Sequence, residues 1–248
     1  MTYVRFWIKP YRYICAGHKK MYMAVCNLSS SKQLNFLKSL SAKEKERLHT
    51  NSTSKKVRKG AVIFSEAELL QSLFCITDGA CKFSIIDDKG KEIVTNLLGK
   101  GDLMGRRSLI SKKGAMVTAT ALSDTTLCCI DNESLLKGFA KNNGFCLDAL
   151  KGFVADDEER HLKMGLYENR RGIKNRLAGL LLYLRDKFGA DDNGTLNIGL
   201  KREEMANVLG TSSEYIISLL STFKKQGIIG LFKGRIRIIS ERKLSKML

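Results

Sequence analysis

The alternation of apolar and polar residues divides the chain into a strand-rich segment followed by a helical segment. Between Val57 and Asp131, short apolar runs alternate with polar turns. Strands at this spacing are typical of a β-barrel or jelly roll. The predicted strands cover residues 62–64, 73–76, 81–86, 93–98, 117–122 and 126–130.

Glycines mark the turns between these runs, because glycine readily adopts the positive φ that tight turns require. The clearest hairpin signal is Asp78-Gly79 with the run that follows it, then residues 88–90 and a further apolar run. The turn signals stand at Lys59-Gly60, Asp78-Gly79, Lys89-Gly90, Lys100-Gly101 and Lys113-Gly114.

Helices are predicted on both sides of the strand segment. Residues 30–49 predict two short helices, the second of which begins at Ala42 and is capped by Ser41. After Asp131 the chain contains no proline, which favours successive helices. One of them covers residues 173–188 and ends at Gly189, a residue suited to a C-cap.

A long helix is predicted from near Asn143 to about Glu168. Its apolar side chains form an imperfect stripe, suited to packing on the barrel and on a second subunit. Charged residues 156–160 interrupt the stripe, so the sequence does not support a regular coiled-coil seam along the whole helix. The stripe consists of Leu147, Leu150, Phe153, Val154, Leu162 and Met164.

The strongest local signal lies in residues 200–229, which predict a helix-turn-helix. The first helix covers residues 203–209, where Ala206 is small enough for a close helix crossing. Gly210 makes the turn, and Ser212 caps a second helix over residues 213–226. The pair is held together by Met205, Val208, Leu209, Ile216, Leu219, Leu220 and Phe223.

The start of the second helix carries the predicted base contacts, because this end of a recognition helix enters the major groove of DNA. Ser213, Glu214, Ile217 and Ser218 lie on its outer face. Glu214 is suited to accept a hydrogen bond from a cytosine amino group. The two serines are suited to meet base edges or phosphates.

Two further apolar runs, residues 228–231 and 236–239, predict a two-stranded wing around Lys233-Gly234. Basic residues at its tip would contact the DNA backbone and contribute affinity without sequence information. The predicted DNA-binding residues are Lys201, Arg202, Thr211, Ser212, Ser213, Glu214, Ile217, Ser218, Lys224, Lys233 and Arg235.

Charge agrees with nucleic-acid binding. The 248 residues include 43 Lys and Arg against 25 Asp and Glu, a net charge of +18 that attracts polyanions. Residues 171–248 hold 15 Lys and Arg against 7 Asp and Glu, a surplus of +8 in the proposed DNA-binding domain. An ordinary helical hairpin is the alternative, but turn, cap, small residue and basic hairpin coincide here.

Other function classes find little support. The sequence has no P-loop, no G-x-G-x-x-G and no nucleophile elbow, so we predict that the protein is not an enzyme. Seven scattered cysteines without a C-x-x-C pair fit a reducing cytoplasm. No apolar stretch reaches the ~20 residues of a membrane helix, so no membrane contact is expected.

Four segments are predicted. Residues 1–29 form an N-terminal extension that is either disordered or, with Met21 or Met23 as the start, partly untranslated. A basic arm that touches DNA phosphates is the less favoured interpretation. Residues 30–142 form the sensor-like domain, 143–170 the dimerisation helix and 171–248 the winged helix-turn-helix domain.

The order of these parts resembles the CRP/FNR superfamily of bacterial regulators. The likeness covers about residues 30–248 and is carried by Lys59-Gly60 and residues 76–79, 100–105 and 200–226. The resemblance implies an α+β fold, with a cyclic-nucleotide-binding-like β jelly-roll, a long dimerisation helix and a winged helix-turn-helix. It also implies a homodimer on a two-fold operator, RNA polymerase as a partner, and effector binding that reorients the DNA-binding domains.

Relatives in this superfamily read bases from the position of Glu214, and the neighbouring Gly210, Ser212 and Ile216 match. The position of Ser218 is usually arginine in those relatives. Losing that arginine removes a bidentate donor worth ~1–3 kcal/mol of base discrimination. A family consensus operator is therefore not expected.

Effector chemistry also departs from the family pattern. Members that bind cyclic AMP place a Gly-Glu pair and a downstream Arg-Ser pair around the nucleotide. Here Gly105 is followed by Arg106, and residues 115–120 lack the Arg-Ser pair, so cyclic AMP is not expected. Gly105, Arg106 and Arg107 are candidate residues for another anion, although exposed arginines are more often solvated surface.

No metal or cofactor is predicted. Oxygen-sensing members hold an iron-sulfur cluster with an N-terminal cysteine cluster, which Cys15 and Cys26 are too few to supply. His18, His49 and His161 form no metal-ligand spacing. The other cysteines are expected to be structural and mostly buried: Cys75, Cys81, Cys128, Cys129 and Cys146.

The sequence thus predicts a DNA-binding transcription regulator. The alternative is a ligand-binding or scaffold protein whose helical C-terminal domain contacts protein rather than DNA. Effector, operator and the direction of regulation stay open.

Overall fold

The computed structural model describes residues 39–154, 172–232 and 234–248. Several predictions lie outside these ranges. They are the N-terminal extension, the first of the two early helices, the second half of the long helix, and the DNA contact of Lys233.

A short helix, α1 (Ala42–Thr50), precedes the strands, as predicted. The Ser41 side chain accepts a hydrogen bond from the Glu44 amide, and the Glu44 carboxylate accepts one from the Ser41 amide. This capping box satisfies donors that the first helical turn leaves unpaired. Leu48 then anchors the helix in the core.

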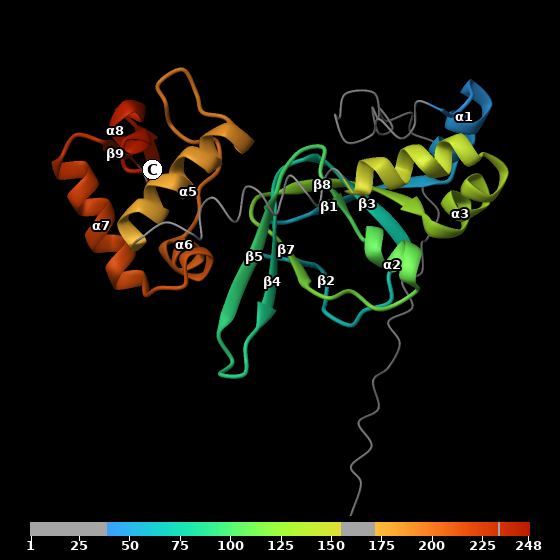
Figure 1. Ribbon diagram of the computed structural model, residues 1–248, viewed down its shortest axis with the longest axis horizontal. Coiled ribbons are helices and arrows are strands. Elements are labelled where there is room, and N and C mark those ends of the chain that lie inside the picture. The colour runs from blue at the N-terminus through green and yellow to red at the C-terminus, as the bar shows by residue number, and fades with distance from the viewer. Residues whose placement is uncertain (1–38, 155–171, 233) are drawn as a thin grey trace, which may run out of the picture.

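The described part of the barrel consists of two four-stranded antiparallel sheets (Figure 1). One sheet has the order β1-β8-β3-β6 and the other β2-β7-β4-β5. The bounds are β1 (Ser52–Val57), β2 (Val62–Phe64), β3 (Ser72–Asp78), β4 (Cys81–Ile86), β5 (Glu92–Leu98), β6 (Leu103–Met104), β7 (Thr118–Ala121) and β8 (Thr125–Asp131).

Side-chain alternation along the strands creates two apolar clusters. Leu73 and Cys75 of β3 pack with Leu135 and Phe145 outside the barrel. Ile76 joins the cluster between the two sheets, and the pairing of β3 with β8 is irregular just after it. One strand thereby contributes to both cores.

All six predicted strands are present, but two strands and a helix were missed. Strand β1 is mostly exposed and polar, so it lacks the apolar alternation that marks a strand. Strand β6 has only two residues. The missed helix is α2 (Arg106–Ser111), which begins at the candidate anion-binding arginines.

The predicted hairpin is present, because strands β4 and β5 pair around a turn that contains residues 87–91. The preceding Asp78-Gly79 turn leads from one sheet to the other, because β3 and β4 lie in different sheets. A tight turn can join two strands of one sheet or lead from one sheet to another. Only the long-range pairing of the strands distinguishes these two arrangements.

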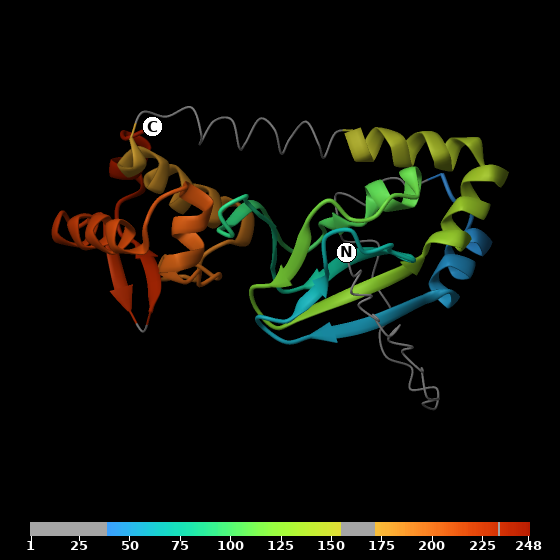
Figure 2. The same cartoon turned by 90° about the horizontal axis from the view of Figure 1, so that it is seen from below.

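After the barrel come α3 (Asn132–Lys141), capped by the Asp131 side chain, and a helix that begins at residue 143 and is described to residue 154. Figure 2 shows this second helix running along one side of the barrel. Phe145 and Ala149 are buried against the core. The position of this helix in Figure 2 and its burial pattern thus agree with what the sequence predicts for the first half of the long helix.

The C-terminal domain is helical with a small sheet. It comprises α5 (Ile173–Phe188), α6 (Arg202–Leu209), α7 (Ser213–Lys225), the strands β9 (Ile229–Phe232) and β10 (Arg235–Ile238), and α8 (Glu241–Ser245). Leu177, Leu181 and Leu184 of α5 are fully buried, as their helical spacing predicts. Only α8 was not anticipated.

This domain packs directly on the barrel, with α5 and α6 beside β5 in both views (Figures 1 and 2). Leu97 and Val94 of β5 belong to the same buried cluster as the α5 leucines. The Tyr183 hydroxyl donates to the Leu97 carbonyl at 3.3 Å, and the Asn207 amide donates to Glu92 at 3.2 Å. Apolar packing and side-chain hydrogen bonds therefore join the two domains.

Candidate nucleic-acid interface

Helices α6 and α7 form the predicted helix-turn-helix. Gly210 ends α6 in the left-handed conformation, with φ of 63°. The Thr211 amide donates to the Ala206 carbonyl at 3.0 Å, which closes the turn. Ser212 then caps α7 by accepting a hydrogen bond from the Tyr215 amide at 3.3 Å.

Buried side chains fix the angle between the two helices. Met205 and Leu209 of α6 face Ile216, Leu220 and Phe223 of α7, and all five are at most 2% exposed. Ala206 is also buried at the crossing, as its small size predicts. The packing holds the first turn of α7 rigidly at the surface.

The outer face of α7 carries the side chains that are predicted to contact base pairs. Glu214, Ile217 and Ser218 are exposed, whereas Ser213 is half-buried. Tyr215 is 46% exposed beside them and was not singled out from the sequence. A large exposed aromatic side chain in the first turn was the signal that could have identified it.

Glu214 is poised as a hydrogen-bond acceptor. Hydrogen bonds from its own backbone amide and from the Ser212 hydroxyl lower the pKa of its carboxyl group. The ionised form has only acceptors, which suits the exocyclic amino group of cytosine and excludes carbonyl oxygens on the base edge.

The wing lies next to this helix. Strands β9 and β10 pair antiparallel, with Arg235 opposite Phe232 at the tip. Arg235, one of the predicted contacts, and Arg237 are both exposed on β10. Alternation along β10 places both arginines on one face of the wing while Ile236 is buried between them.

The remaining predicted residues are spread over a wider surface. Lys224 is exposed near the far end of α7, ~15 Å along the helix axis from Glu214. Arg202 is half-buried at the start of α6, and this burial lowers its pKa. Lys201 is exposed and lies, with Arg235, where the wing faces the barrel. The residues predicted to contact bases and those predicted to contact the DNA backbone are thus separate groups.

The candidate effector residues lie in α2. Gly105 precedes the helix with φ of 87°. Arg106 donates to the Phe153 carbonyl at 3.3 Å and its guanidinium lies 5.4 Å from the centre of the Phe153 ring. Arg107 is exposed and contacts Met116. Arg106 is therefore bound to the helix that begins at residue 143.

Within the described ranges, no three His, Cys, Asp or Glu side chains are close enough together to hold a metal ion. Cys15 and Cys26, the two N-terminal cysteines considered as ligands of an iron-sulfur cluster, lie outside those ranges. Among the helices that can be described, none is both long and apolar enough to cross a membrane.

A winged helix-turn-helix attached to a two-sheet barrel defines a class of DNA-binding regulator. Comparison with known families agrees: residues 54–142 match the cyclic nucleotide-binding domain, and residues 175–247 match the Crp-like helix-turn-helix domain. The chain belongs to the CRP/FNR family of transcription regulators, a family of regulators and not of enzymes.

Similar proteins come from several bacteria. The chain is 26% identical over 199 residues to the CRP-like cAMP-activated global transcriptional regulator of Mycobacterium tuberculosis, covering 74% of this chain and 82% of that protein. It is 29% identical over 206 residues to electron transport regulator A of Shewanella oneidensis, covering 81% and 80%.

A solved structure shows the same fold. FixK2 from Bradyrhizobium japonicum superposes with a TM-score of 0.69 at 21% identity, over 79% of this chain and 96% of that one. The α+β architecture and the DNA-binding regulator function predicted from the sequence are confirmed.

Proposed function

We propose that the protein binds a two-fold DNA operator as a homodimer in the cytoplasm and regulates transcription in contact with RNA polymerase. The observation that carries the proposal is the first turn of α7, where an ionised Glu214 and the exposed Ile217 are held on a rigid scaffold. Paired recognition helices ~34 Å apart would match successive major grooves.

The helix that begins at residue 143 supports the homodimer. Its buried side, with Phe145 and Ala149, covers the barrel. Leu147, Leu150 and Val154 follow one another at helical spacing and are 56%, 45% and 57% exposed. Three large apolar side chains along one helix face are suited to pack on the same face of a second copy.

The proposed effector is not cyclic AMP, although the M. tuberculosis relative is named as cAMP-activated. Two features of α2 support this. No carboxylate follows Gly105 to accept the ribose hydroxyls, and Arg106 is already engaged by Phe153. These residues therefore do not fit a cyclic nucleotide, and Gly105, Arg106 and Arg107 stay candidate contacts only for another anion.

The proposal is tested by selecting bound sites from random duplex DNA at two salt concentrations. We expect a palindromic motif for the unmodified protein. Glu214→Ala should accept other bases at one symmetric position, because one good base contact is worth ~1–3 kcal/mol of discrimination.

Glu203→Ala is the matched control, since it removes an exposed carboxylate from the neighbouring helix α6 and should keep the motif unchanged. Failure to select any motif at either salt concentration would contradict operator recognition. A motif without palindromic symmetry would contradict the homodimer.

A further inference from the structure

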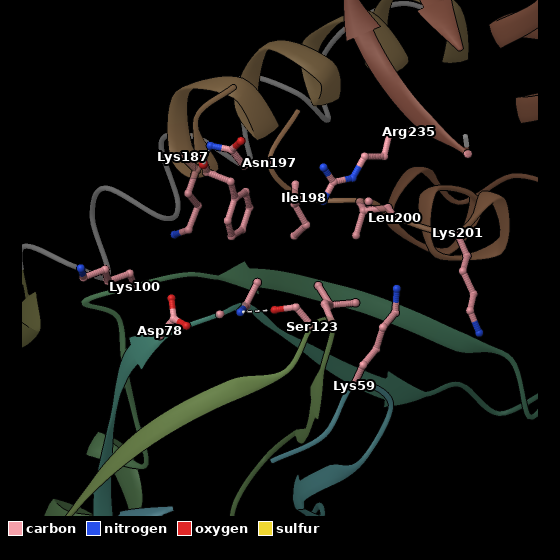
Figure 3. Close-up of a pocket in the computed structure, with 16 residues that line it drawn as sticks. Lys59, Asp78, Lys100, Ser123, Lys187, Asn197, Ile198, Leu200, Lys201 and Arg235 are labelled. Atoms are coloured by element: carbon pink, nitrogen blue, oxygen red, sulfur yellow. Dashed lines mark hydrogen bonds between the residues drawn. The ribbon is translucent and has the colours of Figure 1, made fainter. Parts of the chain in front are cut away.

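A cleft of about 640 Å³ opens between the barrel and the DNA-binding domain (Figure 3). Its barrel side contains Lys59, the turn at Gly79 and Lys100. Its other side contains the end of α5, residues 197–201 and Arg235 of the wing. The volume lies in the range of sites for small ligands.

The cleft is strongly cationic. Lys59, Lys100, Lys201 and Arg235 are exposed, and none forms an ion pair with a carboxylate among the described residues. Figure 3 shows Lys59 extending from the barrel, and Lys201 and Arg235 from the DNA-binding domain, toward the space between them, with Lys100 at one edge of the cleft. Since like charges repel across such a gap, the arrangement gains stability when an anion enters.

A fifth cation is already neutralised. Lys187 of α5 forms an ion pair with Asp102 at 2.8 Å, and both side chains are largely buried. This pair joins the two domains at one edge of the cleft and leaves the four exposed cations for a ligand. The single carboxylate in the lining is Asp78, which is exposed.

The remaining lining is mixed, with Ser123 and Asn197 as polar residues and Leu122, Phe188 and Leu200 as apolar ones. Leu122 and Leu200 are only 3% and 4% exposed, so the half-buried Phe188 is the large apolar side chain that a base can reach. An aromatic ring packs on the flat face of a base. Asp78 is able to accept hydrogen bonds from ribose hydroxyls, because an ionised carboxylate has only acceptors.

We propose that this cleft binds a nucleotide carrying two or more phosphates. The phosphates would contact lysines and arginine from both domains, and the base would pack on Phe188. A DNA duplex is convex and stiff, so its backbone would reach the exposed cations but leave Phe188 uncovered. A small ligand therefore fits the cleft better than flanking DNA does.

The proposal implies regulation, and this part rests on the proposed function. Lys201 and Arg235 line the cleft and are also predicted DNA-backbone contacts. A nucleotide that occupies them would compete with DNA. Coupling between two ligands is reciprocal, so operator DNA would weaken nucleotide binding by the same factor.

Isothermal titration calorimetry of the full chain with ATP in EDTA tests the site, with adenosine as the phosphate-free comparison. We expect saturable binding of ATP and none of adenosine. Lys59→Gln combined with Lys100→Gln should weaken ATP binding at least tenfold, since each lysine contributes a charge-assisted contact.

Lys112→Gln combined with Lys113→Gln is the control for nonspecific attraction to a basic protein, because both lysines are exposed outside the cleft. This variant should bind ATP like the unmodified chain. The proposal is overturned if ATP does not bind, or if both double variants lose affinity equally.

A second measurement follows DNA binding by fluorescence anisotropy, using a short operator and the same operator extended by flanking DNA. ATP should weaken short-operator binding by the unmodified chain and have little effect on the Lys59→Gln, Lys100→Gln variant. If this variant instead loses affinity for the extended DNA alone and the unmodified chain binds no ATP, the cleft contacts DNA and the proposal fails. ATP binding without any operator binding would contradict the proposed function and leave the cleft assignment standing.

Discussion

At the scale of single residues, burial decides the chemistry of the barrel cysteines. Cys75 and Cys81 are at most 2% exposed. Burial and, to a smaller extent, the charge of Asp102 raise the pKa of Cys75 to about 12 and that of Cys81 to about 11, where a hydrogen bond with Thr125 opposes the rise. Thiolate is the reactive form, so these two thiols are protected at neutral pH.

We predict that iodoacetamide at pH 8 will leave Cys75 and Cys81 unmodified in the folded protein. With a pKa of about 12, only ~1 in 10,000 Cys75 side chains would be thiolate at that pH. Peptide mass spectrometry of native and urea-unfolded samples measures the modification.

Cys146 is the internal comparison, because it is half-buried and should react earlier than Cys75 in the folded state. Rapid native labelling of Cys75 would show that the barrel opens easily, or that the thiol is not buried in solution.

At the scale of elements, the turn between β3 and β4 needs glycine for two reasons. Gly79 has φ of 89°, a conformation that costs other residues about 1–2 kcal/mol. A Cβ atom there would lie 2.5 Å from the Asp124 carbonyl oxygen and 2.8 Å from the Thr125 Cα. Both neighbours are backbone atoms, so they cannot move aside as a flexible side chain would.

Gly79→Ala should therefore lower the free energy of unfolding more than Gly60→Ala does. Gly60 has a similar φ of 83°, but its Cβ would meet no atom within 4 Å. We expect about 1–2 kcal/mol for Gly60→Ala and a larger loss for Gly79→Ala. Urea denaturation measures both, and equal losses would show that the turn relaxes to accommodate the methyl group.

At the scale of the whole molecule, the exposed apolar face of the helix that begins at residue 143 is expected to hold two copies together. Leu150→Glu places a charge in that face and should shift the protein toward monomer in sedimentation equilibrium, because an unpaired charge is costly to bury. Operator affinity should fall with it, since only a dimer engages both half-sites.

Lys151→Glu is the matched control, because Lys151 is exposed on the adjacent face of the same helix. It should leave the dimer intact. A Leu150→Glu protein that stays dimeric would place the subunit contact elsewhere.

A network of polar side chains around Glu92 also joins the two domains. Lys82 is only 8% exposed and pairs with Glu92 at 2.6 Å. Partial burial works against ionisation of Glu92, but hydrogen bonds from Lys82, Ser84 and Asn207 and the charge of Lys82 outweigh it and lower the pKa of this carboxyl. The Glu92 carboxylate therefore stays ionised near neutral pH, and its hydrogen bonds link β4 and β5 to α6 of the DNA-binding domain.

Local signals in the sequence determined the elements and the reading helix. Gly210, Ser212 and the spacing of Ile216 and Leu220 predict the helix-turn-helix within a few residues, because capping and helical periodicity depend on near neighbours. The same reasoning found α5 and all six apolar strands. Polar β1 and the two-residue β6 escaped it, since they become strands only by pairing with β8 and β3.

Only the tertiary structure decided which distant segments meet. The assignment of β3 and β4 to different sheets, the ion pair of Lys187 with Asp102, and the cleft between Lys59 and Arg235 join residues far apart in the chain. Such contacts depend on the packing of whole domains, which no local pattern encodes. The sequence by itself therefore determined the class of regulator and its helix-turn-helix, and the packing of the domains determined where the cleft between them lies.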